Sequence, residues 1–166
     1  VTSNDTVLIA GKTSTNDYQY LLKLATMIKQ ITTNLIIDMS AITINDLKQL
    51  KPLMLKPNLQ ELEQLFNQKL TTTKEIVSCL VQLQQLGITY PLVTMGAEGT
   101  IYLSNNCSYQ ITCQPQTVKN TVGAGDSFVA GFIHGFIHQL PVNEILTYAT
   151  ATASATAYSS DLATNN

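Results

Sequence analysis

Short apolar runs alternate along this chain with longer segments of helical periodicity. The runs are about four residues long and are bounded by Gly, Asp or Pro, which is typical of buried strands in a parallel sheet. Between the first two runs, apolar side chains recur at positions 21, 22, 25, 28 and 31, the spacing of one helix face. We therefore expect strands at 7–10, 35–38, 53–56 and 92–95, helices at 17–31, 44–50, 59–66, 74–86 and 142–158, and one more helix from the glycine turn at 123–125 to about residue 138.

Local signals support several of these boundaries. Asn58 and Glu61 have the spacing of a capping box at the start of 59–66, and either Thr43 or Asn45 opens 44–50. The runs 100–103 and 109–112 flank Ser104-Asn105-Asn106 and predict a hairpin. Strands that alternate with helices indicate an α/β protein with a mainly parallel sheet, covered by helices on both sides.

The composition limits the choice of partners. The chain has 166 residues, enough for one domain, and a net charge of −2, which provides no general attraction for nucleic acid or an anionic membrane. All nine basic residues are lysines, so that anions must be held by backbone amides, hydroxyls or Lys. No apolar run approaches the roughly 20 residues of a membrane span. The number of cysteines is odd (Cys79, Cys107 and Cys113), which indicates free thiols and a cytoplasmic location.

Gly123-Ala124-Gly125-Asp126 is the clearest candidate site in the sequence. The first amides of a helix lack internal partners, so a turn of small residues at a helix start can bind a phosphate. Asp126 has two interpretations. It is a simple helix cap, or it is a base that takes a proton from a hydroxyl attacking phosphorus.

Two further groups of polar residues follow predicted strands. Lys56-Pro57-Asn58 and Glu61 follow the third strand, and an ordinary strand–turn–helix junction would be enough to explain them. Thr94-Met95-Gly96-Ala97-Glu98-Gly99 follows the fourth strand, and a simple glycine turn would explain it. Ligands of parallel α/β sheets gather at the carboxyl ends of the strands, which is where both groups lie.

Asn120-Thr121-Val122-Gly123-Ala124-Gly125-Asp126, followed by Ala130-Gly131-Phe132-Ile133, resembles the C-terminal signature of the ribokinase and phosphofructokinase-B sugar kinases. The other two motifs occur in the order found in that family. The resemblance implies that the amides of Gly123, Ala124 and Gly125 hold the transferring phosphoryl group and that Asp126 is the catalytic base.

The same resemblance assigns binding roles to the other motifs. It places Thr94, Gly96 and Gly99 near the phosphates of ATP, and it makes Asn58 and Glu61 position Mg²⁺ and phosphate, with Glu61 reaching the metal through water. Lys56 before the proline resembles the hexose-phosphate branch of the family more than the ribokinase branch.

The implied fold is the ribokinase-like three-layer sandwich with a mainly parallel central sheet. We expect residues 1–166 to be its C-terminal nucleotide-binding and catalytic portion, without the N-terminal half and the lid, and a homodimer would pair through that missing lid. The implied reaction is ATP-dependent phosphorylation of a ketohexose phosphate, as in 1-phosphofructokinase, which converts fructose 1-phosphate to fructose 1,6-bisphosphate. The alternatives are tagatose-6-phosphate kinase, another sugar kinase of the family, or an inactive nucleotide-binding fragment.

Three other features have simpler interpretations. Gly11-Lys12-Thr13 is not a P-loop, because Thr6 occupies the position of its first glycine, and we regard Lys12 as a candidate contact to a sugar phosphate. Gly131 and Gly135 are expected to allow close helix packing. His134 and His138 share a helix face without the glutamate of a His-Glu-x-x-His metal site.

Overall fold

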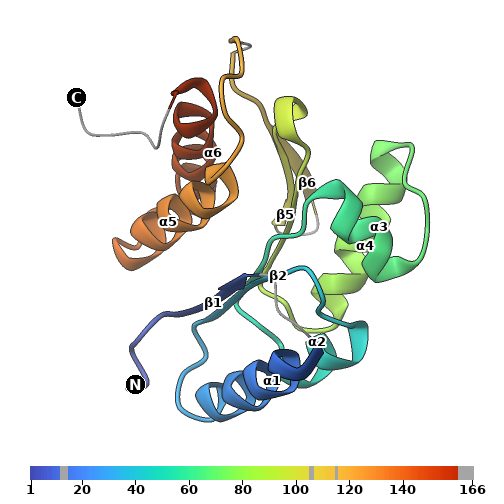
Figure 1. Ribbon diagram of the computed structural model, residues 1–166, viewed down its shortest axis with the longest axis vertical. Helices are drawn as coiled ribbons and strands as arrows, with labels where there is room; N and C mark the ends of the chain where they lie inside the picture. The colour runs from blue at the N-terminus through green and yellow to red at the C-terminus, as the bar shows by residue number, and fades with distance from the viewer. Residues whose placement is uncertain (12–14, 105–106, 115, 161–166) are drawn as a thin grey trace. The chain divides into compact units, whose positions relative to one another are not determined.

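The computed structural model describes residues 1–11, 15–104, 107–114 and 116–160 (Figure 1). The chain divides into two compact units. The first unit consists of Val1–Met95 and Ile101–Tyr109, and the second of Gly96–Thr100 and Gln110–Asn166. Lys12 and the expected turn residues Asn105 and Asn106 lie outside the described residues.

A six-stranded sheet runs through the described part of the chain, with its strands in sequence order. The first four strands are parallel neighbours, and Val7 pairs with Leu35, Ile36 with Met54, and Met54 with Tyr90. This pairing confirms the α/β class with a mainly parallel sheet. The strands are β1 (Val7–Gly11), β2 (Leu35–Met39), β3 (Met54–Leu55), β4 (Tyr90–Thr94), β5 (Thr100–Ser104) and β6 (Cys107–Ile111).

The helices of the first unit connect the parallel strands. They are α1 (Thr15–Lys29), α2 (Ile44–Leu50), α3 (Leu59–Phe66) and α4 (Thr73–Gln85). Thr43, not Asn45, caps α2 and forms a capping box with Asp46. Asn58 and Glu61 form the expected box at α3, and α4 has one between Thr72 and Glu75 that the sequence analysis did not anticipate.

The capping box at α4 lowers the pKa of Glu75. One of its carboxylate oxygens accepts hydrogen bonds from the backbone N–H groups of Thr71 (2.8 Å) and Thr72 (2.9 Å) and from both hydroxyls. These donors, the Thr71 amide foremost, lower the pKa of Glu75 below its usual value of 4.5, because they favour the charged form.

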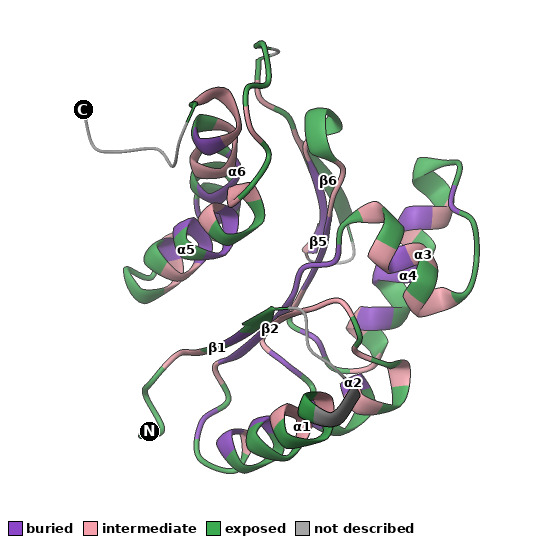
Figure 2. Cartoon of the chain, in the orientation of Figure 1, coloured by how far each residue is buried: buried purple, intermediate pink, exposed green. Residues whose placement is uncertain are grey.

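The core of the first unit lies between its sheet and its helices. Leu35, Ile36 and Ile37 are all buried, as expected for an internal parallel strand. Figure 2 shows buried stretches along the sheet and on the helices of this unit. The cluster includes strand residues Ile9, Leu55 and Val93 and helix residues Ala25, Leu47, Leu50, Leu62, Leu80 and Leu83.

Two helices dominate the second unit, α5 (Ala124–Ile137) and α6 (Val142–Tyr158), and they pack against each other. A Cβ added at Gly131 would lie 2.9 Å from the Cα of Ala149, and one at Gly135 would lie 3.1 Å from the Cα of Ile145. The interpretation of these two glycines as close-packing residues is confirmed. No helix in the described part of the chain is both long and apolar enough to span a bilayer.

Candidate functional site

The carboxyl ends of β3 and β4 bring two of the sequence motifs together in the first unit. The N–H of Thr94, the last residue of β4, donates a hydrogen bond to the carbonyl oxygen of Pro57 (3.0 Å), and Thr94 forms a parallel bridge with Asn58, beyond the end of β3. The Lys-Pro-Asn turn and the end of β4 are therefore neighbours. This edge of the sheet is where ligands bind in parallel α/β folds.

Asn58 and Glu61 are tied to each other at the start of α3. The Asn58 side-chain oxygen accepts from the Glu61 N–H (2.9 Å), and one Glu61 carboxylate oxygen accepts from the Asn58 N–H (2.9 Å). The second oxygen of Glu61 has no hydrogen-bond partner among the described residues. The capping box thus fixes the carboxylate while leaving one oxygen available, which fits a magnesium ion that keeps several of its waters.

Lys56 has a partner that the sequence analysis missed. Its ammonium group lies 3.2 Å from a carboxylate oxygen of Asp38, and the two side chains are only 6% and 17% exposed. The register explains the contact, because Ile37 pairs with Leu55, and Asp38 and Lys56 are the residues that follow these two in the chain. The available signal was a charged residue ending each of two successive apolar runs.

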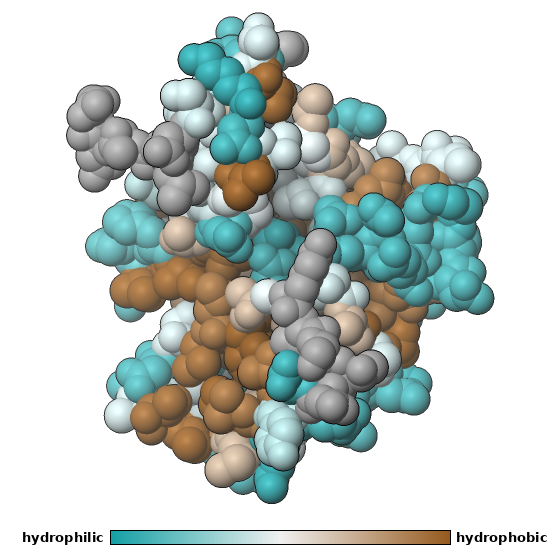
Figure 3. Space-filling model, viewed as in Figure 1, coloured by the Kyte–Doolittle hydropathy of each residue, from teal (hydrophilic) through white to brown (hydrophobic). Residues whose placement is uncertain are grey.

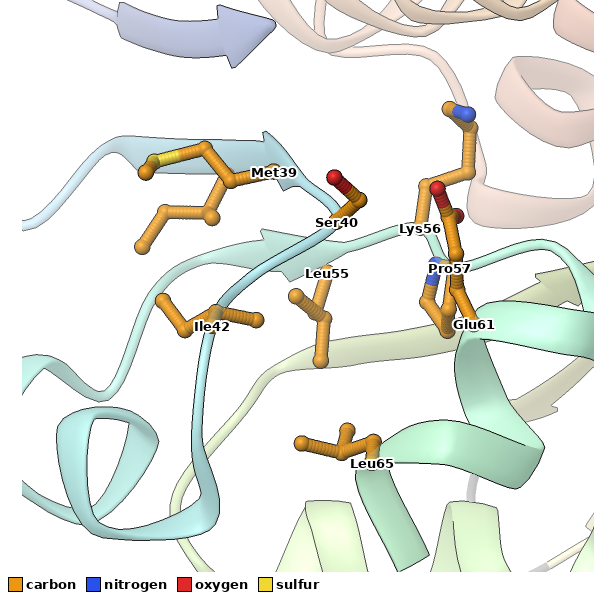
Figure 4. A pocket seen from close by; sticks show the side chains of 9 residues that line it. Met39, Ser40, Ile42, Leu55, Lys56, Pro57, Glu61 and Leu65 are labelled. Atoms are coloured by element: carbon orange, nitrogen blue, oxygen red, sulfur yellow. The ribbon is translucent and has the colours of Figure 1, made fainter. Parts of the chain in front are cut away.

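Lys56 and Glu61 both line a small pocket beside this pair (Figure 4). Its floor is apolar and includes Leu55 and Leu65, while Ser40 adds a hydroxyl from the residue after β2. Figure 4 shows the Lys56 and Glu61 side chains extending to the same side, away from that floor. The pocket therefore offers one cation, one carboxylate and one hydroxyl at the carboxyl edge of the sheet.

The two glycines after β4 serve different structural purposes. Gly96 begins a 3₁₀ turn (Gly96–Glu98) with φ of 59°, and a Cβ added there would meet nothing within 4 Å. Gly99 has φ of 84°, and a Cβ there would lie 1.9 Å from the carbonyl oxygen of Ile111. Close approach of the two backbones thus explains Gly99 without a ligand, whereas Gly96 has open space beside it.

The Gly-Ala-Gly-Asp turn opens α5 in the second unit. Gly123 is the residue before the helix, with φ of 80°, and its carbonyl oxygen accepts from the Ser127 N–H (2.8 Å). The Ala124 N–H reaches the carbonyl oxygen of Thr121 at 3.3 Å, but the amides of Gly125 and Asp126 have no acceptor among the described residues. Both residues are exposed.

Asp126 does not cap the helix that it opens. No side-chain capping hydrogen bond exists at the start of α5, and the carboxylate is exposed in the first turn. Of the two interpretations of this residue, helix capping is not the one that the structure shows. A carboxylate beside two unpaired amides can accept a proton from a hydroxyl that attacks a phosphoryl group held at those amides.

Residues from α6 and the preceding loop hold the turn in place. The Ser127 hydroxyl is 2.7 Å from the hydroxyl of Thr156, and the amides of Lys119 and Asn120 both donate to the carbonyl oxygen of Ala157. Thr156 is not among the site residues predicted from the sequence, because its only signal is its place in an Ala/Thr-rich helix.

The predicted site residues are divided between the two units. Lys56, Asn58, Glu61 and Thr94 belong to the first unit, whereas Gly96, Gly99 and the residues 123–126 belong to the second. Within the described ranges, no three His, Cys, Asp or Glu side chains gather in a way that could hold a metal ion.

The histidine pair takes part in local packing. His138 Nδ1 lies 2.8 Å from the carbonyl oxygen of His134, and the His134 ring stacks on Tyr148 with centroids 5.2 Å apart. Cys79, Cys107 and Cys113 are free thiols, as the sequence analysis expected.

The parallel sheet, with polar residues grouped where its strands end, defines an α/β protein with ligand chemistry at its carboxyl edge. Comparison with known proteins identifies the family. The profile of the pfkB family of carbohydrate kinases matches residues 1–166, so the chain belongs to that family.

Relatives of known name include two sugar-phosphate kinases. The 1-phosphofructokinase of Bacillus subtilis is 32% identical over 161 residues, a match that covers 96% of this chain and 53% of that protein. The tagatose-6-phosphate kinase of Staphylococcus epidermidis is 38% identical over 106 residues, covering 63% of this chain and 34% of that protein. The chain thus spans about half the length of the first of these relatives, and a third of the second is matched.

Solved structures show the same fold. Phosphofructokinase-2 of Escherichia coli superposes with a TM-score of 0.83 at 22% identity, over 95% of this chain and 52% of that one. Ribokinase of Arabidopsis thaliana, solved with ribose and ATP, gives 0.71 at 22% identity, over 87% of this chain and 53% of that one. The expected ribokinase-like fold is confirmed.

Proposed function

We propose that this chain is the C-terminal, nucleotide-binding and catalytic portion of a cytoplasmic, ATP-dependent sugar-phosphate kinase. The observation that carries the proposal is the turn at 123–126, where two exposed amides without acceptors stand beside a carboxylate that does not cap its helix. Family membership supports it. The missing N-terminal half would carry the lid, through which two copies would form a dimer.

The proposed reaction transfers the γ-phosphoryl group of ATP to a sugar hydroxyl. Asp126 accepts the proton of the sugar hydroxyl. The oxygen of that hydroxyl bonds to the γ-phosphorus, and the bond between the γ-phosphorus and the leaving ADP breaks. The amides of Gly123, Ala124, Gly125 and Asp126 stabilise the charge on the transferring group, because N–H groups at a helix start favour anions. Those of Gly125 and Asp126 have no acceptor among the described residues.

The first unit would contribute to nucleotide and metal binding. Lys56 supplies a positive charge for phosphate, and the Thr94 hydroxyl contacts the nucleotide. Gly96 and Gly99, which belong to the second unit, would contact the nucleotide as well. Asn58 holds Glu61 so that its available oxygen meets a water of Mg²⁺. The metal would supply charge neutralisation on the phosphates.

Fructose 1-phosphate is the substrate that we propose, with fructose 1,6-bisphosphate as the product. The match to 1-phosphofructokinase over 96% of the chain favours it. Tagatose 6-phosphate is the second candidate, favoured by a higher identity over a shorter match. A nucleotide-binding fragment without activity of its own is the third, because about half the length of the relatives is not covered.

The decisive test replaces Asp126 by Asn in the full-length protein. We expect kcat to fall by a factor of roughly 10³ or more, while the affinity for Mg-ATP stays within about threefold, because only proton transfer is removed. Glu144→Gln is the matched control, because Glu144 is also an exposed acid in the first turn of a helix of the second unit, α6. This variant should leave kcat unchanged. Near-normal turnover by Asp126→Asn would refute the assignment.

Two further measurements separate the candidates. A panel of sugar phosphates assayed with the full-length protein distinguishes fructose 1-phosphate from tagatose 6-phosphate by kcat/KM. Calorimetric titration of the 166-residue chain with Mg-ATP, followed by an assay for ADP, tests the fragment interpretation. Binding without turnover would support the nucleotide-binding fragment.

A further inference from the structure

Helix α6 contains four threonines, and the last of them forms a different hydrogen bond from the other three. The hydroxyls of Thr147, Thr150 and Thr152 each donate to the carbonyl oxygen four residues earlier in their own helix, a common bond for threonine in helices. The hydroxyl of Thr156 instead lies 2.7 Å from the hydroxyl of Ser127 in α5. Thr156 is buried, so this contact fixes the two helices relative to each other at a point that water does not reach.

The hydroxyl pair is one end of a row of close contacts between α5 and α6, which lie side by side (Figure 1). Ser127, Gly131 and Gly135 follow one another at spacings of four residues, so they share one face of α5. A Cβ added at Gly131 would lie 3.0 Å from the hydroxyl oxygen of Thr152, and one at Gly135 would lie 3.1 Å from the Cα of Ile145. Figure 3 shows mostly pale and hydrophilic surface in the region of α6, as expected when the packing face of this helix is turned to α5.

Both flanks of the turn at 123–126 are attached to the last turn of α6. Before the turn, the amides of Lys119 and Asn120 donate to the carbonyl oxygen of Ala157 (2.9 and 3.2 Å). This carbonyl is one of those at a helix end that have no partner within the helix. After the turn, α5 is attached through Thr156, the residue next to Ala157. Two adjacent residues of one helix thus hold the chain on either side of the candidate site.

The turn itself has few hydrogen bonds that could hold it without these flanks. The amides of Gly125 and Asp126 have no acceptor among the described residues, and no side chain caps α5. The first helical turn is closed by the Ser127 N–H, which donates to the carbonyl oxygen of Gly123 (2.8 Å). Without the Thr156 hydroxyl, the Ser127 hydroxyl would turn to the same carbonyl oxygen, compete with this bond and bend the helix start.

We infer that Thr156 is a positioning residue for phosphoryl transfer, whose hydroxyl acts through Ser127 to set the orientation of the amides and the carboxylate at 123–126. Groups that act on a transferring phosphoryl must be held closely, because a misplacement of about 1 Å can cost up to about 10²-fold in rate. Binding of ATP should not depend on Thr156, since its proposed contacts include the Lys56 charge and the turn at 94–99. The inference rests on the proposed kinase function and adds to it a residue outside the site.

Thr156→Val in the full-length protein tests this role, because valine fills nearly the same space without the hydroxyl. We expect kcat to fall about tenfold, while the KM for Mg-ATP stays within about twofold. Thr150→Val is the matched control, because Thr150 is also buried in α6 but donates its hydroxyl to its own helix. The control should leave kcat unchanged. Equal values of kcat for the two variants would overturn the inference.

Two more variants separate positioning from a general loss of stability. Thr156→Ser restores the hydroxyl and should return kcat to within about twofold of the wild-type value. Ser127→Ala removes the other hydroxyl and should lower kcat as Thr156→Val does, even if Thr156→Val itself does not fold. The double variant should lose no more than the worse single variant, because both remove the same contact. No recovery in Thr156→Ser, or multiplied losses in the double variant, would contradict the positioning role.

Hydrogen exchange of the full-length protein gives a readout that does not use kinase activity. In Thr156→Val, the hydrogen-bonded amides between residues 119 and 127 should exchange about tenfold faster than in the wild type, because the flanks of the turn open more easily. Thr150→Val should leave these rates unchanged. Equal rates in the wild type and Thr156→Val would show that Thr156 does not hold the turn. If the wild type phosphorylates no sugar phosphate, the kinase proposal fails, whereas the exchange rates still decide whether Thr156 holds the turn.

Discussion

The ion pair between Lys56 and Asp38 makes a quantitative prediction about stability. The two charged atoms are 3.2 Å apart, and at an effective dielectric constant of about 20 their attraction is about 5 kcal/mol. Loss of water from a Lys56 side chain that is only 6% exposed costs several kcal/mol and offsets much of this attraction. The intact pair therefore contributes little net free energy, but neither partner can be removed without a large loss.

We expect Asp38→Asn to lower the free energy of unfolding by about 3 kcal/mol, because it leaves a buried ammonium group without its partner. Lys56→Met keeps the apolar stem and should cost less, about 2 kcal/mol, since Asp38 retains some contact with water. The double variant should cost no more than about 2 kcal/mol. The coupling free energy from the cycle is then about 3 kcal/mol.

Urea unfolding of the four proteins at pH 7, followed by circular dichroism, measures this coupling. The chain provides a matched control in the pair of Lys69 and Glu63, which are 2.8 Å apart, with Lys69 85% exposed. The same cycle with Lys69→Met and Glu63→Gln should give a coupling below about 1 kcal/mol, because water screens the pair. If the coupling free energy of Lys56 and Asp38 is no larger than that of the control pair, the reasoning that burial strengthens the coupling is wrong.

Three other predictions concern stability. Gly99→Ala should lower the free energy of unfolding by about 3 kcal/mol or more, because its Cβ would overlap the carbonyl oxygen of Ile111. Gly96→Ala should lower it by about 1 kcal/mol, from backbone strain alone. Equal losses for the two variants on urea unfolding would contradict the contact. Gly131→Ala should lower the free energy of unfolding by about 1–3 kcal/mol by forcing α5 and α6 apart, and a neutral or stabilising effect would show that the helices yield freely. Because the pKa of Glu75 is lowered on folding, its contribution is present above pH 4.5 and is lost as pH falls through the lowered pKa. Glu75→Gln should therefore be less stable than wild type at pH 7 and equally stable in acid, and a gap that does not depend on pH would contradict this.

Part of the site was visible in the sequence because its signals are local. The spacing of Asn58 and Glu61 predicted the capping box that the structure contains, and the glycines at 123 and 125 predicted a turn that opens a helix. The helices 59–66 and 142–158 begin and end where the sequence patterns placed them. A cap or a turn depends on residues within one helical turn, so a few letters of sequence suffice to specify it.

The length of the strand expected at 53–56 depends on its neighbouring strands. The run at 53–56 forms only a two-residue strand, Met54–Leu55. Leu53 still takes part in backbone hydrogen bonds to Leu35 and Tyr90, and the carbonyl oxygen of Pro57 accepts from Thr94 beyond the strand end. The length of this strand is thus decided by the partners on both sides, which an apolar run does not encode.

The alternation of strands and helices, the helix starts and the polar motifs could all be predicted from local sequence patterns. Only the tertiary structure decided that Asp38 is the partner of Lys56, that Gly99 lies against Ile111 while Gly96 does not touch a neighbour, and that the amides of Gly125 and Asp126 lack acceptors. The physical reason is distance along the chain. These contacts join residues brought together by strand register and backbone packing, and the free energy that selects them comes from the whole sheet and its core.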